Sequence, residues 1–132
     1  MLRAFALTAF VALVSRSASA QRARQDQSAV GTWRGTSLCL VRPSPCNNEV
    51  VVYRVIRVGT TDSVSLDARK IVNGEEQEMG VLGCRITTPS EDITCTIRNG
   101  VWHFTVRGDS LTGELRLPDN TKFRDVRTVR SR

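Results

Sequence analysis

The four cysteines are the residues whose spacing most directly indicates a chemical reaction, the formation of disulfide bonds. Cys39 and Cys46 enclose LVRPSP, and Cys84 and Cys95 enclose RITTPSEDIT. Residues that face each other in an antiparallel hairpin have a constant sum of residue numbers, and each pair brackets a turn that contains proline. The spacing therefore predicts two local disulfides, Cys39–Cys46 and Cys84–Cys95. A metal site is the alternative, but neither pair has CxxC spacing and the chain has one histidine, His103.

Groups for acid–base or nucleophilic catalysis are scarce. His103 lacks the partners for a hydrolytic triad, and we expect it on the outer face of a strand. Glu75, Glu76 and Glu78 form the densest acidic cluster. Calcium needs more oxygen ligands at regular spacing, so we expect these residues at a solvated hairpin tip. We predict no catalytic residue, no metal and no cofactor, and a protein that is not an enzyme.

The first twenty residues have the three parts of a secretory signal peptide. Arg3 provides a basic start, residues 4–14 are an apolar stretch, and Ala18-Ser19-Ala20 is a small-residue ending before Gln21. We predict that residues 1–20 are removed on export to the periplasm or the extracellular space, where disulfides form. No second apolar segment of about 20 residues follows, so we expect no membrane span.

The remaining chain has the length of one domain. We predict a flexible N-terminal arm at 21–29 and a single domain at 30–132. The formal net charge of the whole chain is +6, and much of the excess lies in the final stretch TKFRDVRTVRSR. Its basic residues alternate with other residues and no aromatic platform lies among them, so we expect a solvated strand face, no nucleic-acid partner and a monomer.

Extended segments alternate with turn signals about every 8–12 residues, and no helical periodicity of useful length is present. The fold class is therefore all-β. We expect eight strands near residues 31–41, 48–58, 63–72, 78–87, 92–98, 101–107, 110–117 and 121–130. Asn99-Gly100 and Gly108-Asp109 are the clearest two-residue hairpin loops.

Pairing through these two loops gives several strands a common apolar face. Across the three strands, the predicted rows of facing residues are Ile97–Trp102–Leu115, Cys95–Phe104–Gly113 and Ile93–Val106–Leu111. The hairpin of the second disulfide adds Leu82, Cys84 and Ile86 to the same face. This agreement indicates one continuous inner face.

The N-terminal half is less regular. Pairing in register with the first disulfide places Trp33 opposite Val52 and turns Arg54 inward. A buried guanidinium needs a barrel mouth, an acid or a ligand, which makes Arg54 a candidate ligand anchor. The alternative, which we favour, is a bulge that turns Arg54 outward, because the alternate positions are also apolar: Val51, Tyr53 and Val55.

Eight up-and-down strands with one apolar face can close into an antiparallel barrel, which removes the edge strands. Such a barrel is either filled by side chains or holds one small ligand, and a β-sandwich is the alternative architecture. Gly35, Ser37 and Gly113 are small inner-face residues that leave space near Phe104, which favours a cavity.

The opening VGTWRG, with Gly31 two positions before Trp33, resembles the glycine-x-tryptophan start of calycin barrels, the lipocalins and their fatty-acid-binding and avidin relatives. In those families the tryptophan plugs one barrel end and is often covered by an arginine or lysine of the last strand. The resemblance implies a structural plug made by Trp33 with Arg124 or Arg127. The chain departs from fatty-acid-binding proteins, which insert a helical lid where it has a disulfide-stapled turn, and from avidins, which use more tryptophans.

We expect the interior to bind a small apolar or amphipathic ligand, lined by Trp102 and Phe104 and anchored by Arg54. The alternative is a filled barrel that binds a protein partner. Bacterial metalloprotease inhibitors are similar in their GxW-like first strand and local disulfide, and the resemblance implies an inhibitory role for residues 21–29. A third alternative is an exported filled barrel without either activity.

Overall fold

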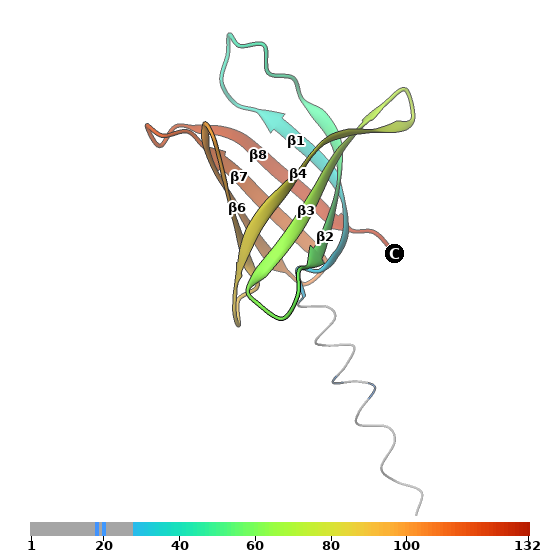
Figure 1. The fold of residues 1–132 in the computed structure, drawn as a ribbon. Coiled ribbons are helices and arrows are strands. Elements are labelled where there is room, and N and C mark those ends of the chain that lie inside the picture. The colour runs from blue at the N-terminus through green and yellow to red at the C-terminus, as the bar shows by residue number, and fades with distance from the viewer. Residues whose placement is uncertain (1–17, 19, 21–27) are drawn as a thin grey trace, which may run out of the picture.

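The computed structural model describes residues 18, 20 and 28–132. Residues 31–130 form eight antiparallel strands that follow one another around a closed barrel, in which the first strand pairs with the last (Figure 1). The strands are β1 (Gly31–Cys39), β2 (Glu49–Arg57), β3 (Ser63–Val72), β4 (Glu75–Thr87), β5 (Asp92–Ile97), β6 (Gly100–Arg107), β7 (Ser110–Arg116) and β8 (Lys122–Arg130). The closed ladder confirms the predicted up-and-down barrel and rules out the β-sandwich.

The hairpin of β3 and β4 is longer than predicted and projects beyond the rest of the barrel wall (Figure 1). Its turn is Asn73-Gly74, and both residues have positive φ, 53° and 81°. An Asn-Gly pair tolerates this conformation and suits a two-residue hairpin loop. The predicted solvated hairpin tip in the run NGEEQEMG is therefore present at Asn73-Gly74, and the exposed residues Glu75, Glu76 and Glu78 follow it within β4.

The register of β1 and β2 differs by one residue from the prediction that used the first disulfide. Trp33 faces Tyr53 instead of Val52, and the ladder ends at the pair Ser37 and Glu49. The disulfide lies beyond this last pair, so the rule of constant residue sums does not apply to it. The inner face of β2 is therefore the alternative set, and its members are buried: Val51, Tyr53 and Val55.

The β5–β6 hairpin differs from the prediction by two residues, which leaves the inner face unchanged. Ile97 faces Gly100, so the loop is Arg98-Asn99 and Gly100 belongs to the strand. A Cβ atom at Gly100 would collide with the carbonyl oxygen of Arg116, which explains why a glycine stands inside this strand. The predicted pairing of β6 with β7 is confirmed, with Phe104 facing Gly113.

Both predicted disulfides are present. Their Cα–Cα distances are 5.9 Å for Cys39–Cys46 and 4.3 Å for Cys84–Cys95. The second disulfide lies inside the barrel wall and belongs to a continuous core that also includes these fully buried side chains: Trp33, Leu66, Ile93, Phe104 and Leu111. One apolar face of the sheet therefore forms the core, as the pairing analysis predicted.

The predicted signal peptide at 1–20 lies outside the described residues except for positions 18 and 20, and so does most of the predicted arm. The arm's last residue, Ala29, is fully buried, and its backbone N–H donates to Glu91 Oε2 at 3.1 Å. Residue 29 therefore belongs to the barrel. Among the described residues, no helix is long and apolar enough to cross a membrane.

Candidate ligand-binding site

One end of the barrel is filled by Trp33, and we call it the closed end. The indole is fully buried, and its Nε1–H donates to the carbonyl oxygen of Ala29 at 2.9 Å. The guanidinium of Arg130 lies 4.2 Å from the centre of the indole ring, in a cation–π arrangement. Arg130 also donates from Nη2 to the carbonyl oxygen of Ser28 and from Nη1 to that of Val30. The plug thus fastens the incoming chain to the barrel.

The arginine that covers Trp33 is not one of the two that the sequence analysis named. Because β8 runs antiparallel to β1, the end of β8 meets the start of β1, and Trp33 pairs with Arg130. Arg124 pairs with Cys39 at the opposite end of the barrel, so it cannot reach the indole. Arg127 lies on the outer face with 77% of its side chain exposed, and it pairs with Asp125.

The other end, which we call the mouth, is formed by the β1–β2, β3–β4, β5–β6 and β7–β8 connections. It contains a pocket of about 260 Å³. The lining residues come from seven strands: Ser37, Glu49, Tyr53, Leu66, Ala68, Met79, Gly80, Leu82, Ile97, Trp102, Phe104 and Arg124. The pocket is therefore mostly apolar, with a small polar group on the side of β1, β2 and β8.

Three aromatic side chains form one wall and the floor of the pocket. Trp102 stacks on Phe104 with the ring centres 5.4 Å apart and the planes at 12°, and Tyr53 meets Phe104 edge to face at 5.7 Å. Both predicted lining residues, Trp102 and Phe104, are thus in the pocket, and Tyr53 is an addition. A stacked, rigid pair of rings offers a flat apolar surface to a ligand.

The hollow arises from different small residues than the sequence indicated. A Cβ at Gly113 would collide with the ring of Phe104, and one at Gly35 would collide with the backbone of Arg127. The space at these two glycines is therefore occupied. Of the three small residues named from the sequence, Ser37 alone lines the pocket, and the remaining room comes from two others: Ala68 and Gly80.

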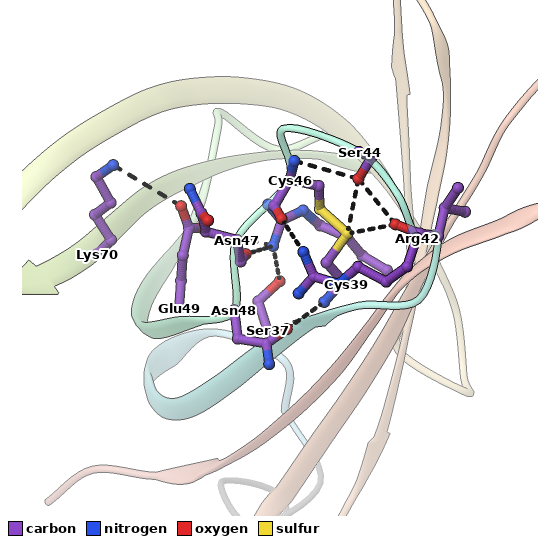
Figure 2. Close-up of polar contacts among 11 residues, drawn as sticks. Ser37, Cys39, Arg42, Ser44, Cys46, Asn47, Asn48, Glu49 and Lys70 are labelled. Carbon is purple, nitrogen blue, oxygen red and sulfur yellow. Dashed lines mark hydrogen bonds and ion pairs between the residues drawn. A yellow bond between two sulfur atoms is a disulfide. The ribbon is translucent and has the colours of Figure 1, made fainter.

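The polar side of the pocket is centred on Arg124, whose side chain is 15% exposed. Its Nη1 donates to Ser37 Oγ and to the carbonyl oxygen of Asn47, both at 3.1 Å, and lies 3.6 Å from Glu49 Oε2. Glu49 Oε1 lies 3.8 Å from Lys70 Nζ (Figure 2). Among the described residues, Nε and Nη2 of Arg124 have no hydrogen-bond acceptor, so donors remain for a ligand.

Tyr53 is the single tyrosine of the chain and lies beside this polar group. Burial raises the pKa of Tyr53 to about 12, and this effect outweighs the opposite influence of the Ser37 hydroxyl and the Arg124 guanidinium. The phenol is therefore neutral at physiological pH and can serve as a hydrogen-bond donor or acceptor.

The loop that contains the first disulfide forms part of the rim of the mouth, and its conformation is fixed by hydrogen bonds. Figure 2 shows Arg42 reaching across this loop, where its Nη1 donates to the carbonyl oxygen of Cys46 at 2.6 Å. The side-chain oxygen of Asn48 accepts a hydrogen bond from the backbone N–H of Cys39 at 2.9 Å. These contacts fix the loop that supplies Asn47 to Arg124.

Arg54 is not part of the pocket. It lies on the outer face, where two hydrogen bonds of 2.8 Å join its guanidinium to the carboxylate of Glu76. This pairing lowers the pKa of Glu76. The role of Arg54 as a ligand anchor was wrong, and the favoured alternative of an outward side chain is confirmed. Its cause is a one-residue shift in register and not a bulge.

The remaining chemical groups lie outside the barrel. His103 points outward beside Glu114, its partner on β7, and the basic C-terminal stretch forms β8. Residues 28–132 contain no group of three or more histidine, cysteine or acidic side chains that could hold a metal ion.

Sequence reasoning missed Glu49, Tyr53 and Arg130. Tyr53 could have been found from the alternative register, and Arg130 from the antiparallel meeting of the first and last strands. The position of Glu49 depends on the conformation of the irregular loop before it, and no sequence pattern predicts that conformation. Comparison of the chain with models of protein families, with curated proteins and with solved structures gave no match.

Proposed function

We propose that this protein binds a small amphipathic molecule at the mouth of the barrel, with the polar part of the molecule at Arg124 and its apolar part against Trp102 and Phe104. The observation that carries this proposal is the pocket itself, which is lined both by the guanidinium of Arg124 and by a stacked aromatic pair. Concave, mostly apolar pockets with a few convergent polar groups are typical ligand sites.

The charges around Arg124 favour a hydrogen-bond acceptor with negative charge. Arg124 and Lys70 both approach the single carboxylate of Glu49, so this group of three carries a net positive charge. Hydrogen bonds from a guanidinium to an anionic group are stronger than those between neutral partners. A sulfonate, carboxylate or phosphate would therefore be held better than an uncharged head group of similar size.

The size of the pocket limits the ligand. Its volume of about 260 Å³ is slightly below the range of roughly 300–1,000 Å³ that is usual for small-molecule sites. The bound molecule is therefore compact, or part of it lies outside the pocket. The two disulfides fit an exported protein, because such bonds persist in oxidising compartments.

Two related fluorescent probes test this proposal. Anilinonaphthalene sulfonate carries a negative charge, and phenylnaphthylamine is the same molecule without the sulfonate. We expect both to bind in titrations followed by probe fluorescence. The variant Arg124→Met should weaken binding of the sulfonate about tenfold or more, since a hydrogen bond to a charged group is worth ~1.5–3 kcal/mol. It should change binding of the uncharged probe much less.

The matched control is Arg127→Met, which removes an arginine of the same strand whose side chain lies on the outer face. This variant should bind both probes like the unaltered protein. Failure of the unaltered protein to bind either probe would refute the proposed function. Equal losses of sulfonate binding in the two variants would refute the role of Arg124.

A further inference from the structure

The seam between β4 and β5 is the weakest join in the barrel wall. These strands pair at three residue pairs, from Arg85 with Thr94 to Thr87 with Asp92, whereas every other pair of neighbouring strands has five or more. All three pairs lie toward the closed end. In the half of the barrel that holds the pocket, β4 and β5 are therefore not joined by a ladder.

The second disulfide stands where this ladder stops. Cys84 and Cys95 occupy the position that follows the pair Arg85 and Thr94, and the bond between them joins the two strands there. Beyond it, residues 75–83 of β4 pair with β3 on one edge, and no strand of the described part of the chain pairs with the other edge. The disulfide thus limits the separation of the strands to the half that faces the mouth.

The pocket reaches this unladdered part of the seam from inside. Gly80 and Leu82 of β4 and Ile97 of β5 all line it. A second depression, a groove of about 330 Å³, lies around Gly83 and Thr96 and includes both strands on either side of the seam. Cβ atoms at Gly80 and Gly83 would meet no atom of the described residues within 4 Å.

The two sides of the mouth differ in polarity. On the side of β1, β2 and β8, Arg124 contacts Asn47 and Glu49, and Lys70 contacts Glu49. An apolar group that passed there would have to separate charged partners, which is costly. On the side of the seam the pocket lining is apolar, and Met79 is 40% exposed. The groove outside the seam has polar side chains, but no ion pair among the described residues crosses it. The apolar route between pocket and solvent is therefore the seam.

The free edge of β4 is also protected against pairing with another chain. Glu75 and Glu78 place charges along it, and Met79 is an extra residue in the ladder with β3, which bends the strand. Charged side chains and bulges are known devices that keep edge strands from pairing. The edge of β4 can therefore stay unpaired without forming a sheet with a strand of another chain.

We propose that the ligand enters and leaves the pocket sideways, through the seam between β4 and β5, and that the apolar end of the bound molecule lies between Leu82 and Ile97. This inference rests on the proposed function and adds the route to it. The polar end of the molecule remains at Arg124, on the far side of the pocket. The pocket of about 260 Å³ is then one part of a site that continues into the seam.

A cross-link across the seam tests the route. In the double variant Leu82→Cys/Ile97→Cys, the two new thiols continue the register of the native disulfide, because both residue pairs have the same sum. Oxidation joins them directly, and a short bismaleimide joins them where the disulfide does not close. Peptide mass mapping verifies that the native pairs are unchanged. Stopped-flow fluorescence then measures the rates of association and dissociation of anilinonaphthalene sulfonate.

We expect the cross-link to slow both rates by roughly tenfold or more, as for any binding step whose gating motion is blocked. Two controls separate this effect from others. The variant Leu82→Ser/Ile97→Ser has the same loss of apolar surface without a link, and Thr105→Cys/Thr112→Cys places a link across β6 and β7, where the ladder is complete. The serine variant shows what the loss of apolar lining does to the rates by itself, and the linked seam variant should be roughly tenfold or more slower than it. The β6–β7 control lies outside the pocket and should exchange the probe at nearly unaltered rates.

Rates in the linked seam variant that equal those of the serine control would overturn the proposed route while leaving the ligand site intact. Slowing in the β6–β7 control to the same degree would also overturn it, because general stiffening of the barrel would then explain the result. Absence of probe binding in the unaltered protein would instead refute the proposed function. The failures of the two proposals are therefore distinguishable.

Discussion

The two ends of the barrel use arginines of the same strand in opposite ways. The side chains of Arg130 and Arg124 both lie on the inner face of β8, and both residues pair with β1. At the closed end, Arg130 covers Trp33 and binds carbonyl oxygens of the incoming chain. At the mouth, Arg124 faces a pocket and keeps two nitrogens free of acceptors among the described residues. One side-chain type thus completes the core at one end and borders a hollow at the other.

The difference is caused by the residues opposite these arginines. Trp33 is a large side chain fully buried in the apolar core at its end, whereas the corresponding layer at the mouth contains Ser37, Ala68 and Gly80. Interiors are normally packed at the density of organic crystals, so a layer of small residues next to aromatic rings leaves room. We infer that stability is concentrated at the closed end, and we propose that ligand binding takes place at the mouth.

The largest expected effect comes from removing the plug. Trp33→Ala should lower the free energy of unfolding by about 3–5 kcal/mol, the usual cost of truncating a fully buried tryptophan. Trp102→Ala should cost clearly less, since Trp102 is half-buried and borders the pocket. Urea unfolding followed by circular dichroism measures both values. Equal losses of unfolding free energy in the two variants would show that both ends contribute alike to stability, which would contradict the proposed difference between them.

A smaller effect is expected from the phenol at the mouth. The pKa of Tyr53 is raised from 10.0 to about 12, so the folded protein keeps its proton more tightly than the unfolded chain. The stabilisation is complete below pH 10 and is lost as the pH rises toward 12, at a cost of about 2–3 kcal/mol. The variant Tyr53→Phe should lack this part of the alkaline decline.

Because the chain has one tyrosine, the ultraviolet absorbance of phenolate reports this group alone. We expect a titration midpoint near pH 12 in the folded protein and near pH 10 in the denatured one. A folded-state midpoint near 10 would mean that Tyr53 is in contact with water, and the mouth would then be more open than the structure indicates.

The smallest expected effect is on the outer wall, which belongs to neither end. Arg54→Ala removes the pair with Glu76, whose side chains are 37% and 34% exposed. Exposed ion pairs contribute little, so the melting temperature should change by about 2 °C or less. Probe binding should be unchanged. A clear loss of probe affinity in this variant would restore Arg54 as a ligand anchor.

The sequence was sufficient for the fold because alternation, turn residues and cysteine spacing agreed with one another. The loop at Gly108-Asp109 and the hairpin of Cys84 and Cys95 both fixed their registers correctly. The register of β2 was harder, since both of its faces are apolar and the preceding loop is irregular. A one-residue shift exchanges the two faces of a strand, and this shift decided the position of Arg54.

The candidate site was predicted in part. Trp102 and Phe104 were recognised as pocket residues because they follow the inner face of β6. Arg124 was identified as an inward arginine of the last strand but was assigned to the wrong end. Glu49 and Lys70 could not be assigned, because their approach depends on how the β1–β2 loop and the long β3–β4 hairpin sit around the mouth.

Native mass spectrometry tests the central claim most directly. The protein and its Arg124→Met and Arg127→Met variants are purified without detergent, mixed with anilinonaphthalene sulfonate, and measured under native and then denaturing conditions. We predict one bound probe on the unaltered protein and on Arg127→Met, lost on denaturation, and little or none on Arg124→Met. A bare mass for all three proteins, or equal occupancy in both variants, would contradict the account of a ligand pocket anchored by Arg124.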